Sequence, residues 1–171
     1  MCEYCGCQDI AAIGELTREH DAVVAHIAEV RAFLRDDSVE GAAKTSRRIA
    51  ELLGPHTVVE EEGLFPLMAE EFPDHIEVLE GEHRQIESVL AEAADGTPDD
   101  PTWPARLLAG LEMLREHILK EQNGVFPATL TVLDTAGWER VATMRGHAGS
   151  ALVPPHGHHP HPRDHHHRLG A

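Results

Sequence analysis

The feature that most constrains the fold is an apolar spacing of alternately three and four residues, which recurs in four separate stretches. This spacing places apolar side chains on one face of an α-helix, so each stretch is predicted to be amphipathic and helical. The stretches fill residues 10–136 and are separated by short polar connections. Together they predict an all-α fold, an antiparallel four-helix bundle. A weaker apolar stretch from Thr135 to Arg145 predicts a short fifth helix.

Each of the four predicted helices carries one histidine on its apolar face, where the pattern calls for an aliphatic side chain. These histidines are His20, His56, His83 and His117. A buried imidazole without a partner costs about 1–3 kcal/mol. Four of them in one core therefore need one another, or a metal.

Two of the histidines begin a repeated sequence that adds a carboxylate one helical turn later. HTVVEEEGLFP contains His56 and Glu60, HILKEQNGVFP contains His117 and Glu121, and both fit HxxxExxGxFP. Residues at i and i+4 lie about 40° apart around a helix, so both side chains of a pair reach the same point in the bundle centre. Four imidazoles and two carboxylates in a helical bundle match a dinuclear site for non-haem iron or manganese.

These elements, with REHD around His20 and GEHRQI around His83, resemble the hemerythrin-like, or HHE cation-binding, family over roughly residues 10 to 133. The resemblance implies a di-iron centre in which Glu60 and Glu121 bridge the two irons. His20 and His56 would bind mainly one iron, and His83 and His117 the other.

The oxygen carriers of this family have a fifth histidine where this chain has Glu87. An anionic ligand at this position would favour oxidised metals and disfavour reversible release of oxygen. Glu87 is either an additional ligand or a polar residue beside the site. Five further glutamates neighbour site residues, and a solvent-facing position is favoured for each, namely Glu19, Glu61, Glu62, Glu82 and Glu116. For Glu19, Glu82 and Glu116, which directly precede a histidine, the alternative is a supporting contact to a ligand.

The two ends of the chain differ in composition from the bundle, which divides the chain into residues 1–9, 10–146 and 147–171. Cys2, Cys5 and Cys7 form CxxCxC, whose thiolates suit Zn²⁺ or Cu(I). Since a closed tetrahedral site needs a fourth ligand, the segment is either an incomplete metal site or a reduced terminus without metal. Residues 147–171 hold eight of the fourteen histidines among Pro and Gly and are expected to be disordered. Their binding of divalent ions is either a reservoir for iron, nickel or zinc, or fortuitous.

Charge and hydropathy exclude several classes of function. With 30 Asp and Glu against 14 Lys and Arg, a net charge of −16 argues against binding nucleic acid or an anionic membrane. The chain has no apolar run of roughly 18 residues and no signal sequence, so a cytoplasmic location is expected. The favoured function is a non-haem di-iron protein that reacts with or senses O₂, peroxide or nitric oxide, including removal of peroxide.

The alternative function is storage or trafficking of iron or another transition metal, with Mn or Zn as other occupants of the bundle site. The CxxCxC segment and the histidine tail would then load or unload that site. No side chain on the apolar faces is a separate nucleophile, so the sequence does not choose between an enzyme and a sensor. It indicates no particular protein partner.

Overall fold

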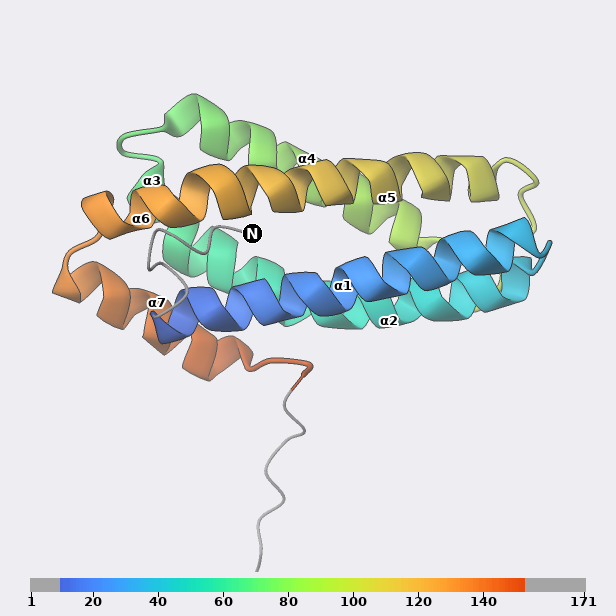
Figure 1. Ribbon diagram of the computed structural model, residues 1–171, viewed down its shortest axis with the longest axis horizontal. Coiled ribbons are helices and arrows are strands. Elements are labelled where there is room, and N and C mark those ends of the chain that lie inside the picture. Colours follow the sequence, from blue (N-terminus) through green and yellow to red (C-terminus); the bar gives the residue numbers. More distant parts are fainter. Residues whose placement is uncertain (1–9, 153–171) are drawn as a thin grey trace, which may run out of the picture.

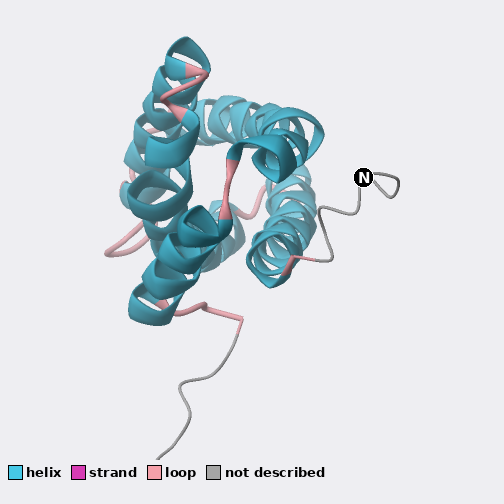
Figure 2. Ribbon diagram, turned by 90° about the vertical axis from the view of Figure 1, so that its left-hand side faces the viewer, coloured by secondary structure: helices cyan, strands magenta, loops and turns pink. Residues whose placement is uncertain are grey.

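The computed structural model describes residues 10–152, which form four helical rods, each running opposite to the one before it in the chain, and one further helix outside them (Figure 1). The helices are α1 (Ala11–Arg35), α2 (Val39–Val58), α3 (Phe65–Met68), α4 (Pro73–Ala91), α5 (Trp103–Lys120), α6 (Phe126–Val132) and α7 (Thr135–Ala148), with the π-helical segments η2 (Val59–Leu64) and η3 (Glu121–Val125). The predicted all-α bundle is confirmed. Helix α1 packs along α2 and α4 along α5, while α2 contacts α4 and α1 contacts α5, so the rods enclose a common centre (Figure 2).

Two of the rods are composite. Segments α2, η2 and α3 form one rod, and α5, η3 and α6 form another. Each π-helical segment lies in a copy of the repeated sequence and ends directly before its Phe-Pro. Proline has no N–H and its ring displaces the carbonyl four residues earlier, so the α-helical hydrogen-bond pattern cannot continue unchanged through it. Glu60 and Glu121 lie at the start of these wide turns, which frequently occur at functional sites.

A polar layer divides the hydrophobic core into two clusters. On α1, Leu16 belongs to one cluster and Val23 to the other, and His20 lies between them. The fully buried Trp103 anchors the far end of the bundle, because its Nε1–H donates to the carbonyl of Val89 on α4 at 3.1 Å. The histidines therefore sit with apolar side chains above and below them.

The fifth helix, α7, packs against η2 outside the four rods. Asp134 caps its start by accepting a hydrogen bond of 2.8 Å from the Gly137 N–H. Gly63 of η2 permits the close approach, since a Cβ there would lie 3.2 Å from Cβ of Met144. The helix ends at Ala148, three residues later than predicted, and so includes His147, which the sequence placed in the tail.

None of the helices among residues 10–152 combines the length and apolarity needed to cross a membrane.

Candidate metal centre

The structure brings together the six side chains predicted to bind metal. Two groups of four donors share Glu60 and Glu121, one with His20 and His56 and the other with His83 and His117. Within each group the donor atoms lie within 4.8 Å of one another. All six residues are buried, and the two glutamates are 0% exposed.

Each glutamate directs one oxygen at each half of the centre. In Glu60, Oε1 lies 3.2 Å from Nε2 of His56 and Oε2 lies 3.3 Å from Nε2 of His83. In Glu121, Oε1 lies 2.9 Å from Nε2 of His117 and Oε2 lies 3.0 Å from Nε2 of His20. This is the arrangement required of a carboxylate that bridges two cations.

The donor atoms are close, yet most are not hydrogen-bonded to one another. Both oxygens of Glu60, both of Glu121, and Nε2 of His117 are buried and make no hydrogen bond within residues 10–152. Leaving buried polar atoms unpaired costs about 1–3 kcal/mol each. A set of five such atoms facing the same space is explained by cations there, and imidazole nitrogens with carboxylate oxygens fit non-haem iron.

The outward nitrogen of each ring is held by a residue from a neighbouring rod. Nδ1–H of His56 donates to Glu19 at 2.8 Å, and Nδ1–H of His83 donates to Glu61 at 2.8 Å. A carboxylate at Nδ1 fixes the ring and leaves the Nε2 lone pair facing the centre, as metal-binding histidines require.

The His117 ring is held in the same manner, whereas the His20 ring contacts an amide. Nδ1–H of His117 donates to Glu82 at 2.9 Å, while Nε2 of Gln122 lies 3.4 Å from Nδ1 of His20. An amide presents either an oxygen or a nitrogen to a ring. It therefore fixes His20 less strictly than a carboxylate fixes the other three.

The expectation that the neighbouring glutamates face solvent was wrong for Glu19, Glu61 and Glu82, which accept these hydrogen bonds. Glu62 and Glu116 are exposed, as predicted. The sequence did contain a signal for two of these contacts, namely the pairs Glu19-His20 on α1 and Glu82-His83 on α4. In each pair the glutamate accepts from the histidine of the next rod. A Glu-His pair alone does not predict such a contact, because Glu116 in the pair Glu116-His117 is exposed.

The remaining predicted ligands lie elsewhere. Glu87 is exposed and belongs to neither donor group, although the sequence left it open as a ligand. Cys2, Cys5 and Cys7 lie outside the described residues, as do residues 153–171.

The duplication extends to the aromatic rings that cover the centre. The Phe126 ring stacks on His20 with 5.6 Å between centroids and 7° between planes. The Phe65 ring stacks on His83 in the same way, at 5.7 Å and 12°. Both phenylalanines come from the GxFP ends of the repeats and are buried, so they exclude water from one face of each ring.

The electrostatics favour bound cations. Burial lowers the pKa of the His56 imidazole, but the carboxylates of Glu60 and Glu19 outweigh burial and raise this pKa to about 10. The pKa of His83 is raised to about 9 for the same reason, mainly by Glu60. Burial raises the pKa of Glu60, yet the two imidazoles hold it well below its usual value. Without metal, His56 and His83 therefore retain their protons at neutral pH.

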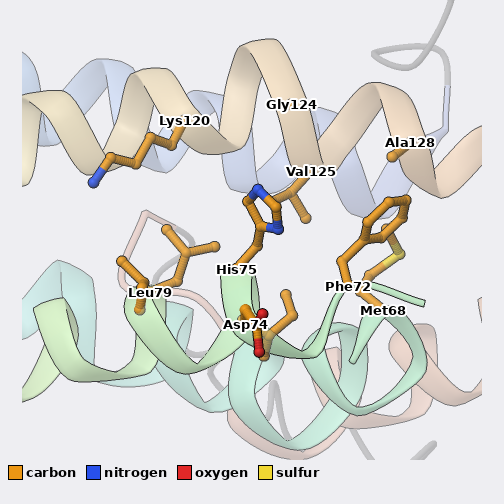
Figure 3. A pocket seen from close by; sticks show the side chains of 11 residues that line it. Met68, Phe72, Asp74, His75, Leu79, Lys120, Gly124, Val125 and Ala128 are labelled. Atoms are coloured by element: carbon orange, nitrogen blue, oxygen red, sulfur yellow. The ribbon is translucent and has the colours of Figure 1, made fainter. Parts of the chain in front are cut away.

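A cavity of about 500 Å³ opens between α4 and η3, beside the centre (Figure 3). Leu79 lies one helical turn before His83, and Val125 lies one turn after Glu121. The lining is mostly apolar, and the ring of His75 projects into it. The cavity thus reaches the apolar cluster that includes Met68 and Leu79, and none of the six donor residues lines it.

Residues 11–129 match the family model described as the hemerythrin HHE cation binding domain. No curated protein and no solved structure gives a significant match to the chain. The matched segment contains all six donor residues and ends within α6, so α7 lies beyond it.

Proposed function

The chain belongs to the hemerythrin HHE cation-binding domain family, and on that premise we propose that its centre binds two non-haem iron ions and reacts with O₂, peroxide or nitric oxide. One observation carries the proposal. Glu60 and Glu121 are fully buried, and each directs one unpaired oxygen at each pair of histidines. Two cations, each held by two imidazoles and sharing both carboxylates, would satisfy every one of these atoms.

The protein's own residues would prepare the centre for a small oxidant. His20 and His56 would hold one ion, and His83 and His117 the other. The bound irons would supply the electrons and the coordination position for the oxidant. Around them, stacked phenylalanine rings and apolar clusters exclude water and so limit side reactions.

The lining of the cavity beside α4 favours the entry of an uncharged ligand. Its wall includes Leu79, Val125 and Met68, which offer no hydrogen bonds to a polar substrate. The ammonium of Lys120 at its edge is paired with Glu82. A small molecule such as O₂ or nitric oxide would therefore enter more readily than an anion.

Elemental analysis of anaerobically purified protein, followed by optical spectra on adding each oxidant, tests the proposal. We expect about two irons per chain and a new absorption band with at least one oxidant. A His56→Ala/His117→Ala variant should lose the iron. A His26→Ala/His75→Ala variant, which removes two histidines outside the donor groups, should keep it. Unchanged metal in the first variant would contradict the dinuclear centre, and another metal in native protein would contradict iron.

Metal storage or delivery remains a second candidate because residues 153–171, which follow the bundle in the sequence, include seven histidines. Removal of this segment separates the two functions. A protein that reacts with an oxidant should keep its optical response without the segment. A delivery protein should instead keep its two ions and lose transfer of iron to an acceptor chelator.

A further inference from the structure

Helix α7 lies outside the segment shared with the family, yet it reaches the metal centre. The Arg145 guanidinium on its last turn donates to both oxygens of Glu19, at 2.8 and 3.0 Å. The hydroxyl of Ser150, just beyond the helix, donates to Glu19 at 2.5 Å. Nε of Arg145 also lies 3.1 Å from the carboxylate of Glu15. One carboxylate of α1 is therefore held by three donor groups from the C-terminal segment.

That carboxylate is the partner of a proposed metal ligand. Glu19 is 1% exposed, and its Oε2 accepts the Nδ1–H of His56 at 2.8 Å. Two contacts thus link Arg145 to an imidazole of the centre. A planar guanidinium that bonds both oxygens fixes the direction as well as the position of a carboxylate. With Glu19 fixed, the His56 ring has one orientation.

None of the other three rings has a support of this kind among residues 10–152. The Glu61 side chain that holds His83 is 32% exposed. The Glu82 side chain that holds His117 is 14% exposed, and its own partner, Lys120, is 46% exposed. Water can therefore compete at these supports but not at Glu19. Glu82 is the counterpart of Glu19, because each directly precedes a site histidine and accepts from the ring of the next rod. Its partner is the flexible Lys120, whereas the partner of Glu19 is an arginine from α7.

We propose that Arg145 is a positioning residue for one of the two metal positions, the one formed by His20 and His56. It acts through Glu19, so that α7 controls how firmly this ion is held without contacting it. The ion at His83 and His117 is independent of Arg145. This inference rests on the proposed function, since it requires two bound ions.

Release of iron to a chelator tests the assignment. Full-length protein is loaded anaerobically with Fe(II) and mixed with an excess of a ferrous chelator that absorbs visible light. Loss of a support of this kind typically weakens metal binding by about 10–100-fold. Arg145→Ala should therefore release one ion about 10–100-fold faster and leave the other unchanged. Arg145→Lys should fall between, because an ammonium can replace the charge but not the paired contact.

Three further variants separate positioning from mere loss of packing. Arg140 lies on the same helix and donates to the carbonyl of Glu62 at 3.3 Å, with no contact to Glu19. Arg140→Ala should leave both release rates unchanged. In a His83→Ala background, which keeps both histidines of the first position, Arg145→Ala should still accelerate release of the remaining ion. In a His56→Ala background it should have no effect.

Three results would overturn the inference while leaving two bound ions in place. These are an unchanged rate in Arg145→Ala, equal acceleration of both ions, and the same acceleration in Arg140→Ala. Failure of the unaltered protein to bind two ions is a different result, because it would overturn the proposed function and the inference together.

Discussion

Glu60→Gln is the most informative single substitution at the centre. Glutamine keeps the size of the side chain and one carbonyl oxygen, but it replaces the second oxygen by an NH₂ group and removes the negative charge. In the native side chain, one oxygen lies 3.2 Å from Nε2 of His56 and the other 3.3 Å from Nε2 of His83. The substitution therefore affects both metal positions, and we expect neither to keep its ion at micromolar free iron.

The expected loss of thermal stability follows from the number of bound ions. A ligand present at 100 times its dissociation constant stabilises the folded protein by about 2.7 kcal/mol. Two iron ions at that saturation stabilise the bundle by about 5 kcal/mol. For a chain of this length, about 1 kcal/mol corresponds to roughly 2–4 °C in melting temperature. Iron should thus raise the melting temperature of the unaltered protein by roughly 10–20 °C, and Glu60→Gln should lose most of this gain.

Differential scanning calorimetry of iron-loaded and metal-free samples, combined with elemental analysis, measures this gain. Comparing both samples of one variant cancels the effect of the substitution on the metal-free fold. Glu62→Gln is the matched control, because Glu62 lies two residues further along η2 and is exposed. It should keep both ions and the full gain. Two bound ions and an undiminished gain in Glu60→Gln would refute the bridging assignment.

Four further predictions concern the cavity, the protons and the tail. A Cβ at Gly124 meets no atom within 4 Å, so Gly124→Leu should fill the cavity and slow the reaction with nitric oxide several-fold in stopped-flow measurements, at unchanged iron content. Gly54→Leu is the control, because a Cβ at Gly54 also meets no atom within 4 Å, and it should leave the rate unchanged. Equal rates in the two variants would contradict entry through the cavity. With pKa values of about 10 at His56 and about 9 at His83, metal must displace protons at neutral pH, so affinity should fall as pH falls, and constant affinity from pH 6.5 to 9 would contradict this. Folding raises the pKa values of His56 and His83 above 6.5, so protonation of these two rings stabilises the metal-free protein. This stabilisation is complete below pH 6.5 and is lost as the pH rises through 9–10, so the melting temperature of metal-free protein should fall over that range. Deletion of residues 153–171 should leave two ions in the bundle by elemental analysis, whereas a lower content would place an ion in the tail.

The features that the sequence predicted correctly depend on spacing within one helix. His56 and Glu60 share a face because they are four residues apart, and this holds wherever the helix packs. The apolar spacing likewise determined which face of each rod turns inward. Burying four such faces together leaves a bundle as the natural arrangement, so the histidines had to meet in its centre.

The features that the sequence did not predict depend on contacts between rods. Glu61 and Glu62 are adjacent, and the periodicity does not show which of them reaches His83, because the π-helical turn changes the angular position of the residues that follow Glu60. The contact of Arg145 with Glu19 spans 126 residues, and the weak apolar pattern of α7 gives no sign of it. Such contacts are fixed by how the rods are placed and not by local propensity.

The two copies of the repeated sequence have the same local structure but different surroundings. Gly63 and Gly124 occupy the same place in HxxxExxGxFP, and both lie in π-helical segments. At Gly63, α7 packs so closely that an added Cβ would lie 3.2 Å from Met144. Gly124 instead lines the open cavity. One copy of the repeat is therefore covered by a helix that also anchors Glu19, while the other borders a cavity on the side of α4. On this asymmetry, we expect an oxidant to enter on the α4 side of the bundle, whereas Arg145 supports the His56 ring from the α7 side.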